Sequence, residues 1–195
     1  MTVEIQKKFF DNECLDFIDA TIEESKNTAC LRASYPTNNW MPEIIHNSAP
    51  VLIYDIHDSE ILNQNLKSKI EFEGDAIFMI YYWPTGSYIP WHNDAHAKLV
   101  GTLYCNTWWH RDWGGAFLYE DGDKTLAEFP EYNKLVIQRD NTWHCTTPVQ
   151  KQLYHPIDWD HRRIYPEYNQ GRPVPITRTT LQIFMELYDK KNMYN

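Results

Sequence analysis

Positive charge and long apolar runs are both scarce in this sequence. Its 195 residues include 18 Lys and Arg against 27 Asp and Glu, so the formal net charge is -9. An acidic chain repels phosphate groups, and we therefore expect neither nucleic acid nor an anionic membrane surface as a partner. No apolar run approaches the length of a membrane-spanning helix, and the opening MTVEIQKKFFDNECLDF lacks the long apolar core of a signal peptide.

Cysteine is also sparse. The four cysteines are Cys14, Cys30, Cys105 and Cys145, and no two of them have the Cys-x-x-Cys spacing of a zinc site or redox motif. A domain of this size does not need disulfides for its stability. We therefore expect reduced thiols and a cytoplasmic protein.

Apolar and aromatic residues are plentiful, at 43% and 15% of the chain, which favours a packed core and excludes disorder. We expect one domain over residues 1–195, with a helical support segment at 1–75 and a β-rich core at 76–188. Helical spacing is found at 11–27 and 59–70. Short β-forming segments follow at 76–82, 98–105, 116–119, 134–137, 143–149 and 177–187. This pattern is typical of a β-sandwich or a barrel-like jelly roll.

The segment IYYWPTGSYIPWHND ends in His92-Asn93-Asp94. Residues two apart on a strand point to the same face, so His92 and Asp94 would project together. Two His and one carboxylate on one side of an ion suit non-haem Fe(II). We take His144 as the third ligand; the alternative is an ordinary buried, hydrogen-bonded histidine. Its competitors for the role are His96, His110, His155 and His161.

Arg178 opens the segment RTTLQIFM, in which Arg178, Thr180, Gln182 and Phe184 share one face. The other face is wholly suited to a core, and the first is polar without being simply solvent-facing. An arginine pointing into a barrel needs a partner, because a buried unpaired charge is costly. A ligand carboxylate, held by a two-pronged hydrogen bond, would satisfy it. The alternative is an exposed strand arginine.

These segments resemble the 2-oxoglutarate- and Fe(II)-dependent dioxygenases, and within them the prolyl 4-hydroxylase-like branch. The matching pieces occur in the family's order over about residues 78–188. They are Tyr82-x-Pro84 with Gly86, Tyr88 and His92-x-Asp94; Thr102-Leu-Tyr104-Cys-Asn106; Gly114-Gly115-Ala-Phe-Leu; Asn133-Lys-Leu-Val-Ile; His144 with Pro148-Val149; and Arg178-x-Thr180-x-Gln182-x-Phe184.

The resemblance implies a double-stranded β-helix, a cupin-like jelly roll, flanked by N-terminal helices. It implies Fe(II) bound by His92, Asp94 and His144, and 2-oxoglutarate paired through its far carboxylate with Arg178. Tyr104 would hydrogen-bond that carboxylate, and Tyr82, Thr180 and Gln182 would line the same site. Dioxygen would be the co-reactant, and ascorbate is a candidate reductant.

The resemblance also makes a peptidyl proline the first expected substrate, with a small molecule as the alternative. Residues 150–175 are longer than usual in this branch, and we interpret them as a lid or insertion. Two other readings stay open: a non-enzymatic jelly-roll binding or structural protein, and a cupin-like enzyme that uses iron without 2-oxoglutarate. Six tryptophans are expected in loops around the mouth: Trp40, Trp83, Trp91, Trp108, Trp109 and Trp113.

Overall fold

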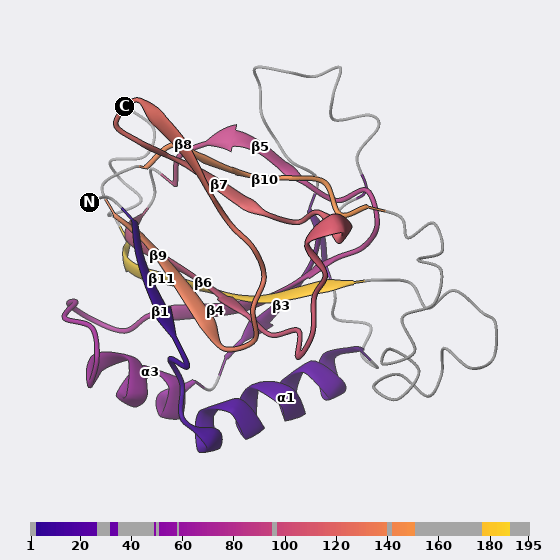
Figure 1. Ribbon diagram of the computed structural model, residues 1–195. Coiled ribbons are helices and arrows are strands. Elements are labelled where there is room, and N and C mark those ends of the chain that lie inside the picture. Colours follow the sequence, from indigo (N-terminus) through magenta and orange to yellow (C-terminus); the bar gives the residue numbers. More distant parts are fainter. Residues whose placement is uncertain are drawn as a thin grey trace, which may run out of the picture.

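Two antiparallel sheets face each other, and two helices cover the outside of the larger one (Figure 1). The computed structural model describes residues 3–26, 32–34, 49, 51–57, 59–94, 97–139, 142–150 and 177–187. The elements in chain order are β1 (Val3–Lys7), α1 (Asn12–Lys26), β2 (Arg32–Ser34), β3 (Val51–Ile56), α3 (Glu60–Lys67), β4 (Ile77–Trp83), β5 (Ile89–His92), β6 (Ala97–Tyr104), β7 (Phe117–Asp121), β8 (Lys124–Glu128), β9 (Lys134–Arg139), β10 (His144–Thr146) and β11 (Arg178–Leu187).

The larger sheet has seven strands in the order β1-β9-β6-β11-β4-β3-β2. The central strand β11 pairs with β6 and β4 along most of its length. Its residues Leu181, Ile183 and Met185 are fully buried toward the helices. The alternate residues therefore face the smaller sheet, because successive strand residues point to opposite faces. This places the polar face of β11 inside the molecule.

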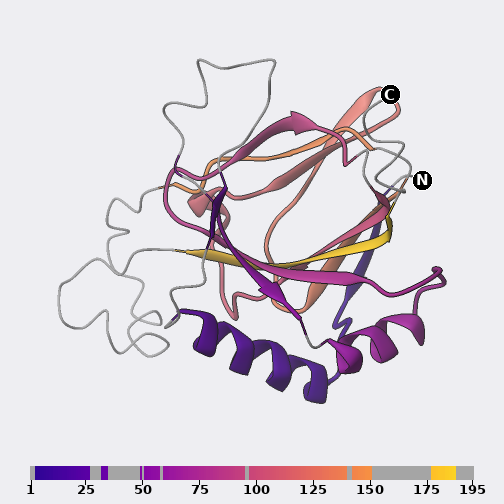
Figure 2. The ribbon, with the colours of Figure 1, turned by 180° about the vertical axis from the view of Figure 1, so that it is seen from behind.

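The helices lie against the outer face of the larger sheet (Figure 2). They bury apolar side chains in a core cluster shared with that sheet. Helix α1 is capped by Asp11, which precedes it and whose Oδ1 accepts a hydrogen bond of 3.0 Å from the backbone N–H of Cys14. Ile18 of α1 and Leu62 and Leu66 of α3 pack into the same core cluster as the outward residues of β11. No helix among the described residues is long and apolar enough to cross a membrane.

The smaller sheet has four strands in the order β5-β10-β7-β8. Between the sheets lies a second apolar cluster of buried side chains. It consists of Val3, Tyr104, Phe117, Tyr119 and Val136. This cluster separates the sheets while leaving room for polar side chains beside it, and the functional site is built there.

The predicted architecture, mainly β with flanking N-terminal helices, is confirmed. The helix predicted at 59–70 ends earlier, at Lys67. Strands β1, β2, β3 and β8 were not expected, and each of them is short, with six residues or fewer. The predicted lid at 150–175 lies outside the described residues except for Gln150.

Candidate metal centre

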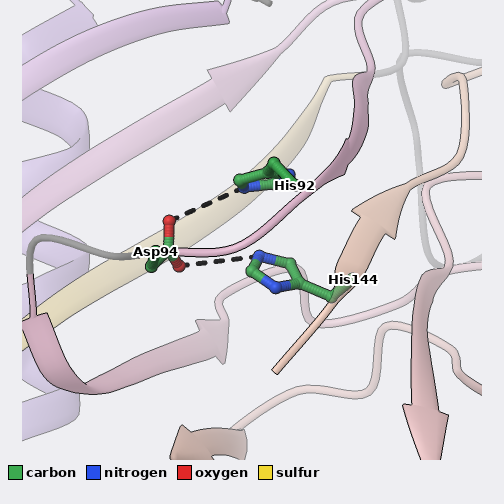
Figure 3. Close-up of side chains that lie close together, drawn as sticks. All are labelled: His92, Asp94 and His144. Atoms are coloured by element: carbon green, nitrogen blue, oxygen red, sulfur yellow. Dashed lines mark ion pairs between the residues drawn. The ribbon is translucent and has the colours of Figure 1, made fainter. Parts of the chain in front are cut away.

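His92 and His144 come from neighbouring strands and lie directly opposite each other in the pairing of β5 with β10. Strand β5 ends at His92, and the chain then places the Asp94 carboxylate beside both rings (Figure 3). His92 Nε2 is 3.6 Å from Asp94 Oδ1, and His144 Nε2 is 3.5 Å from Asp94 Oδ2. The three ligand atoms lie within 4.8 Å of one another, which is close enough to share one metal ion.

Both imidazoles are oriented by the backbone. His92 Nδ1 is 2.8 Å from the carbonyl of Pro90, and His144 Nδ1 is 2.8 Å from the carbonyl of Thr142. A carbonyl oxygen only accepts, so each Nδ1 carries the proton and donates it. Each Nε2 therefore presents its lone pair toward Asp94, which is the orientation that a metal ligand requires.

His144 is held neutral by its surroundings. Its side chain is buried and stacks on Phe117, with ring centroids 5.1 Å apart and an interplanar angle of 28°. Burial, followed by the neighbouring His92, lowers the pKa of His144 to about 4. At neutral pH the ring is thus a neutral donor beside the Asp94 carboxylate, and such a set binds a divalent cation.

Arg178 is fully buried, and its Nε and Nη1 have no hydrogen-bond partner among the described residues. The guanidinium lies over the ring of Trp83, 4.7 Å from its centroid, and 5.2 Å from that of Tyr104. Burial lowers the pKa of Arg178 from its ordinary value, and Tyr104 opposes this. Stacking on aromatic faces offsets only part of the cost of a buried cation.

Tyr104 stands between two buried cations. Its hydroxyl has no hydrogen-bond partner among the described residues, and burial raises its pKa while Arg178 lowers it. On the other side, Lys134 Nζ is 5.4 Å from the ring centroid of Tyr104 and forms a 2.9 Å ion pair with Glu128. Lys134 thus has a carboxylate partner within the protein, and Arg178 lacks one in the part of the chain that is described.

Gly115 allows Arg178 to occupy this position. It has φ +64°, and a Cβ added to it would lie 2.8 Å from Arg178 Cδ. Only glycine combines this backbone conformation with so close an approach. Gly115, the second glycine of the sequence motif, therefore shapes the wall of the arginine site.

Thr180 and Gln182 lie on the same inner face as Arg178 and are tied together. Thr180 Oγ1 accepts from Trp83 Nε1 at 3.0 Å and from Gln182 Nε2 at 3.1 Å. Gln182 Oε1 in turn accepts from Thr102 at 2.9 Å. These polar atoms form hydrogen bonds with one another across β4, β11 and β6, so their side chains are held in place on the same inner face as Arg178.

Tyr82 does not line this site, and the prediction for it is wrong. Its side chain points to the helical side of the sheet, where its hydroxyl is 2.5 Å from Ser25 Oγ and donates to the carbonyl of Ile22 at 3.1 Å. The next residue, Trp83, faces Arg178 instead and pairs with it in the strand register. A shift of one residue along a strand exchanges the two faces, and the motif alone did not fix that position.

The other predicted residues are divided between the surface, the core and undescribed segments. His110 lies in a surface turn, where its Nδ1 accepts from the backbone N–H of Asp112. Trp113 is buried, and Trp108 and Trp109 pack edge-on against it. Trp91 remains 36% exposed. Trp40, His96, His155 and His161 lie outside the described residues.

Gln138 and Lys134 were missed by the sequence reasoning, and Trp83, which was expected in a loop at the mouth, is instead buried on β4 against Arg178. Lys134, Val136 and Gln138 occupy alternate positions on β9, so they share one face of the strand. Two polar residues on this buried strand therefore face the interior of the molecule. Polar residues at every second position of a buried strand were the available signal. Gln138 Nε2 donates to Asp94 Oδ2 and lies 3.4 Å from His144 Nε2.

No protein-family model and no curated protein sequence matches the chain. Solved structures do. A prolyl-4-hydroxylase from Pseudomonas putida is similar with a TM-score of 0.62 and 15% identity, over 95% of this chain and 92% of that one. A prolyl hydroxylase from Trichoplax adhaerens, solved in complex with a hypoxia inducible factor peptide fragment, is similar with a TM-score of 0.67 and 13% identity, over 97% and 84%.

A third similar structure is an oxidoreductase of the 2OG-Fe(II) oxygenase family from Burkholderia pseudomallei, with a TM-score of 0.63 and 11% identity over 96% of this chain and 86% of that one. At such low identity the likeness concerns the fold. It confirms the double-stranded β-helix that the motifs predicted. The chemistry must be argued from the side chains of this chain.

Proposed function

We propose that the protein is a 2-oxoglutarate- and Fe(II)-dependent dioxygenase that hydroxylates an unactivated C–H group. The observation that carries the proposal is the combination of two features in one interior. Two imidazoles and a carboxylate converge at a single point, and a buried guanidinium with unmatched donors lies on the inner face of the same double sheet. The first feature suits a divalent iron with open positions, and the second suits an organic diacid.

In this proposal His92 Nε2, His144 Nε2 and one oxygen of Asp94 hold the iron. Arg178 and the hydroxyl of Tyr104 receive the far carboxylate of 2-oxoglutarate, which would satisfy the donors that the described residues leave unpaired. When bound, iron and 2-oxoglutarate supply the oxidising chemistry: one atom of dioxygen enters succinate as carbon dioxide leaves, and the other enters the substrate.

The chain's own residues orient these groups and keep water away. The carbonyls of Pro90 and Thr142 fix the two imidazole rings, so that no ring rotation accompanies binding. Phe117, Val136 and Tyr119 form an apolar wall against His144 and Tyr104. A dry wall strengthens the pairing of Arg178 with a carboxylate, because the local dielectric is low.

The arginine site favours this proposal over a cupin-like iron enzyme that needs no 2-oxoglutarate. A buried cation without a carboxylate partner is costly unless a ligand supplies one. The convergence of the three ligands likewise favours an enzyme over a structural jelly roll, in which these residues would have no reason to meet.

For the substrate we propose a peptidyl proline, with a small molecule as the alternative. The support is the likeness to two prolyl hydroxylases, one of which was solved with a peptide fragment bound. Dioxygen is the expected co-reactant and ascorbate a candidate addition.

The test has two stages. Anaerobic addition of Fe(II) and then 2-oxoglutarate should produce a weak visible charge-transfer band. Metal binding without that band would favour the cupin-like enzyme, and no metal uptake would favour a structural protein. Aerobic incubation with proline-containing peptides, followed by a small-molecule panel, should give succinate together with a mass gain of one oxygen atom. Failure of every substrate to raise succinate formation would contradict the enzyme assignment.

A further inference from the structure

Gln138 is the polar side chain nearest the metal centre that the ligand set does not use. It lies on β9, faces the interior and is only 6% exposed. Its Nε2 donates to Asp94 Oδ2 and is 3.4 Å from His144 Nε2. It therefore contacts two of the three proposed ligands at once.

The orientation of the amide follows from its neighbours. Asp94 is a carboxylate and can only accept, and His144 Nε2 is a lone pair because Nδ1 donates to the carbonyl of Thr142. The NH2 group must therefore point at the ligands, since a reversed amide would set one oxygen against another. The amide oxygen is left buried, without a hydrogen-bond partner among the described residues.

The strand register holds Gln138 in place from both sides. Val3 of β1 and Val100 of β6 pair with it in the larger sheet. Asp94, in contrast, lies beyond the end of β5, where its backbone carbonyl accepts a hydrogen bond of 3.1 Å from the N–H of Ala97. A rigid strand residue thus restrains the ligand that comes from an irregular segment.

We propose that Gln138 is a positioning residue of the metal centre, an inference that rests on the proposed function. Its N–H group holds Oδ2 of Asp94, so that Oδ1, which lies beside His92, is the oxygen presented to the metal. A carboxylate held in this way binds through one oxygen, which leaves positions for 2-oxoglutarate and dioxygen. Hydrogen bonds to metal-bound carboxylates set ligand geometry and affinity in this manner.

The alternative to a positioning role is that Gln138 acts as a placeholder for the metal ion. The amide nitrogen would then fill the metal's own position in the metal-free protein and would have to leave when the ion binds. The two roles predict opposite effects of a Gln138 substitution on metal affinity. Removing a positioning group weakens metal binding, whereas removing a placeholder strengthens it.

The experiment compares Gln138→Met, which keeps the length but lacks the donor, with Gln6→Met as the matched control. Gln6 lies on β1 and its amide reaches only Glu4 among its described hydrogen bonds. Binding of Mn(II) is measured by calorimetry. We expect Gln138→Met to bind about 10- to 100-fold more weakly than wild type, and Gln6→Met to bind as wild type does.

A spectroscopic readout separates positioning from a general loss of structure. At saturating Fe(II) and 2-oxoglutarate without oxygen, the charge-transfer band of Gln138→Met should shift in position, while that of Gln6→Met should not. If Gln138→Met does not fold, Gln138→Asn retains the amide but withdraws it by one methylene, and the same loss of affinity is expected.

The outcomes are distinguishable. A wild-type protein that binds no Mn(II) would overturn the proposed function and this inference with it. A wild type that binds, together with a Gln138→Met variant that binds equally or more tightly, would overturn the positioning role alone. Tighter binding would identify the amide as the placeholder.

Discussion

The candidate metal centre and the arginine site differ in how far the protein itself supplies hydrogen-bond partners for their polar side chains. At the candidate metal centre, His92 and His144 are held by backbone carbonyls and Asp94 by Gln138, so the proposed ligand set is ordered by the protein itself. At the arginine site, Arg178 rests on aromatic faces with donors unmatched by the described residues. The first region is organised in advance, whereas the second, in the proposed function, is completed by the carboxylate that it binds.

The largest effect is expected from Asp94→Ala, which removes the group shared by both imidazoles. Turnover should fall below detection, and Mn(II) binding should weaken by roughly 100-fold or more, because only the two imidazoles remain as ligands. Succinate formation and calorimetry measure the two effects. Full activity in this variant would remove Asp94 from the ligand set.

Arg178→Met tests the other half of the comparison. A charge-assisted hydrogen bond contributes about 1.5–3 kcal/mol, so the KM for 2-oxoglutarate should rise about 10- to 100-fold while Mn(II) affinity stays unchanged. The metal-free variant should be as stable as wild type or more so, because an unmatched buried cation has been replaced by an apolar chain. An unchanged KM would place the diacid elsewhere.

Lys134→Met is the control for that stability measurement. Lys134 is the other buried cation beside Tyr104, but it has Glu128 as its partner at 2.9 Å. Removing it leaves a carboxylate without its cation, so thermal unfolding should occur at a lower temperature, with a loss of about 1–3 kcal/mol. Equal effects of the two substitutions would contradict the contrast between a matched and an unmatched cation.

The pH dependence of the metal-free protein should report His144. Its pKa is about 4 in the folded state against an ordinary value of 6.5. The unfolded chain therefore binds the proton more readily, and stability present above about pH 6.5 is lost as the pH falls toward 4. The full loss is about 3 kcal/mol. Urea unfolding at a series of pH values measures it, and His144→Gln should flatten the curve over this window.

The smallest effect is expected from Gly115→Ala, measured against Gly122→Ala. The two glycines have φ +64° and +63°, so each substitution costs about 1–2 kcal/mol of backbone strain. Only at Gly115 would the new Cβ meet Arg178, while at Gly122 nothing lies within 4 Å. The KM for 2-oxoglutarate should therefore rise roughly 10-fold in the first variant alone. Equal KM values in the two variants would show that Gly115 does not set the position of Arg178.

The convergence of the proposed ligands could be predicted because their chemistry is specific and their order along the chain is distinctive. His92, Asp94 and His144 were predicted together, and their ligand atoms lie within 4.8 Å of one another. Arg178 was predicted from the polar face of an otherwise apolar strand, and it is indeed buried. In both cases a residue type that is costly to bury stood where burial was expected.

The remaining parts depended on information that the local sequence does not carry. Tyr82 and Trp83 are adjacent aromatics, and only the pairing of Trp83 with Arg178 decides which faces inward. Gln138 acquires its role from Asp94, 44 residues away in the sequence. Strand β1 has only Val3 buried and is fixed by its partner β9. Such contacts become visible only when distant segments are placed side by side.

The pairing of β1 with β9 has a practical consequence for handling the protein. Residues Lys134 to Gln138 of β9 are all buried, and β1 is what separates them from the margin of the larger sheet. A truncation that removes Val3–Lys7 would leave β9 as a bare edge strand with open N–H and C=O groups, an arrangement that invites intermolecular pairing. Such a shortened protein should aggregate, and it should do so from the strand that carries Gln138.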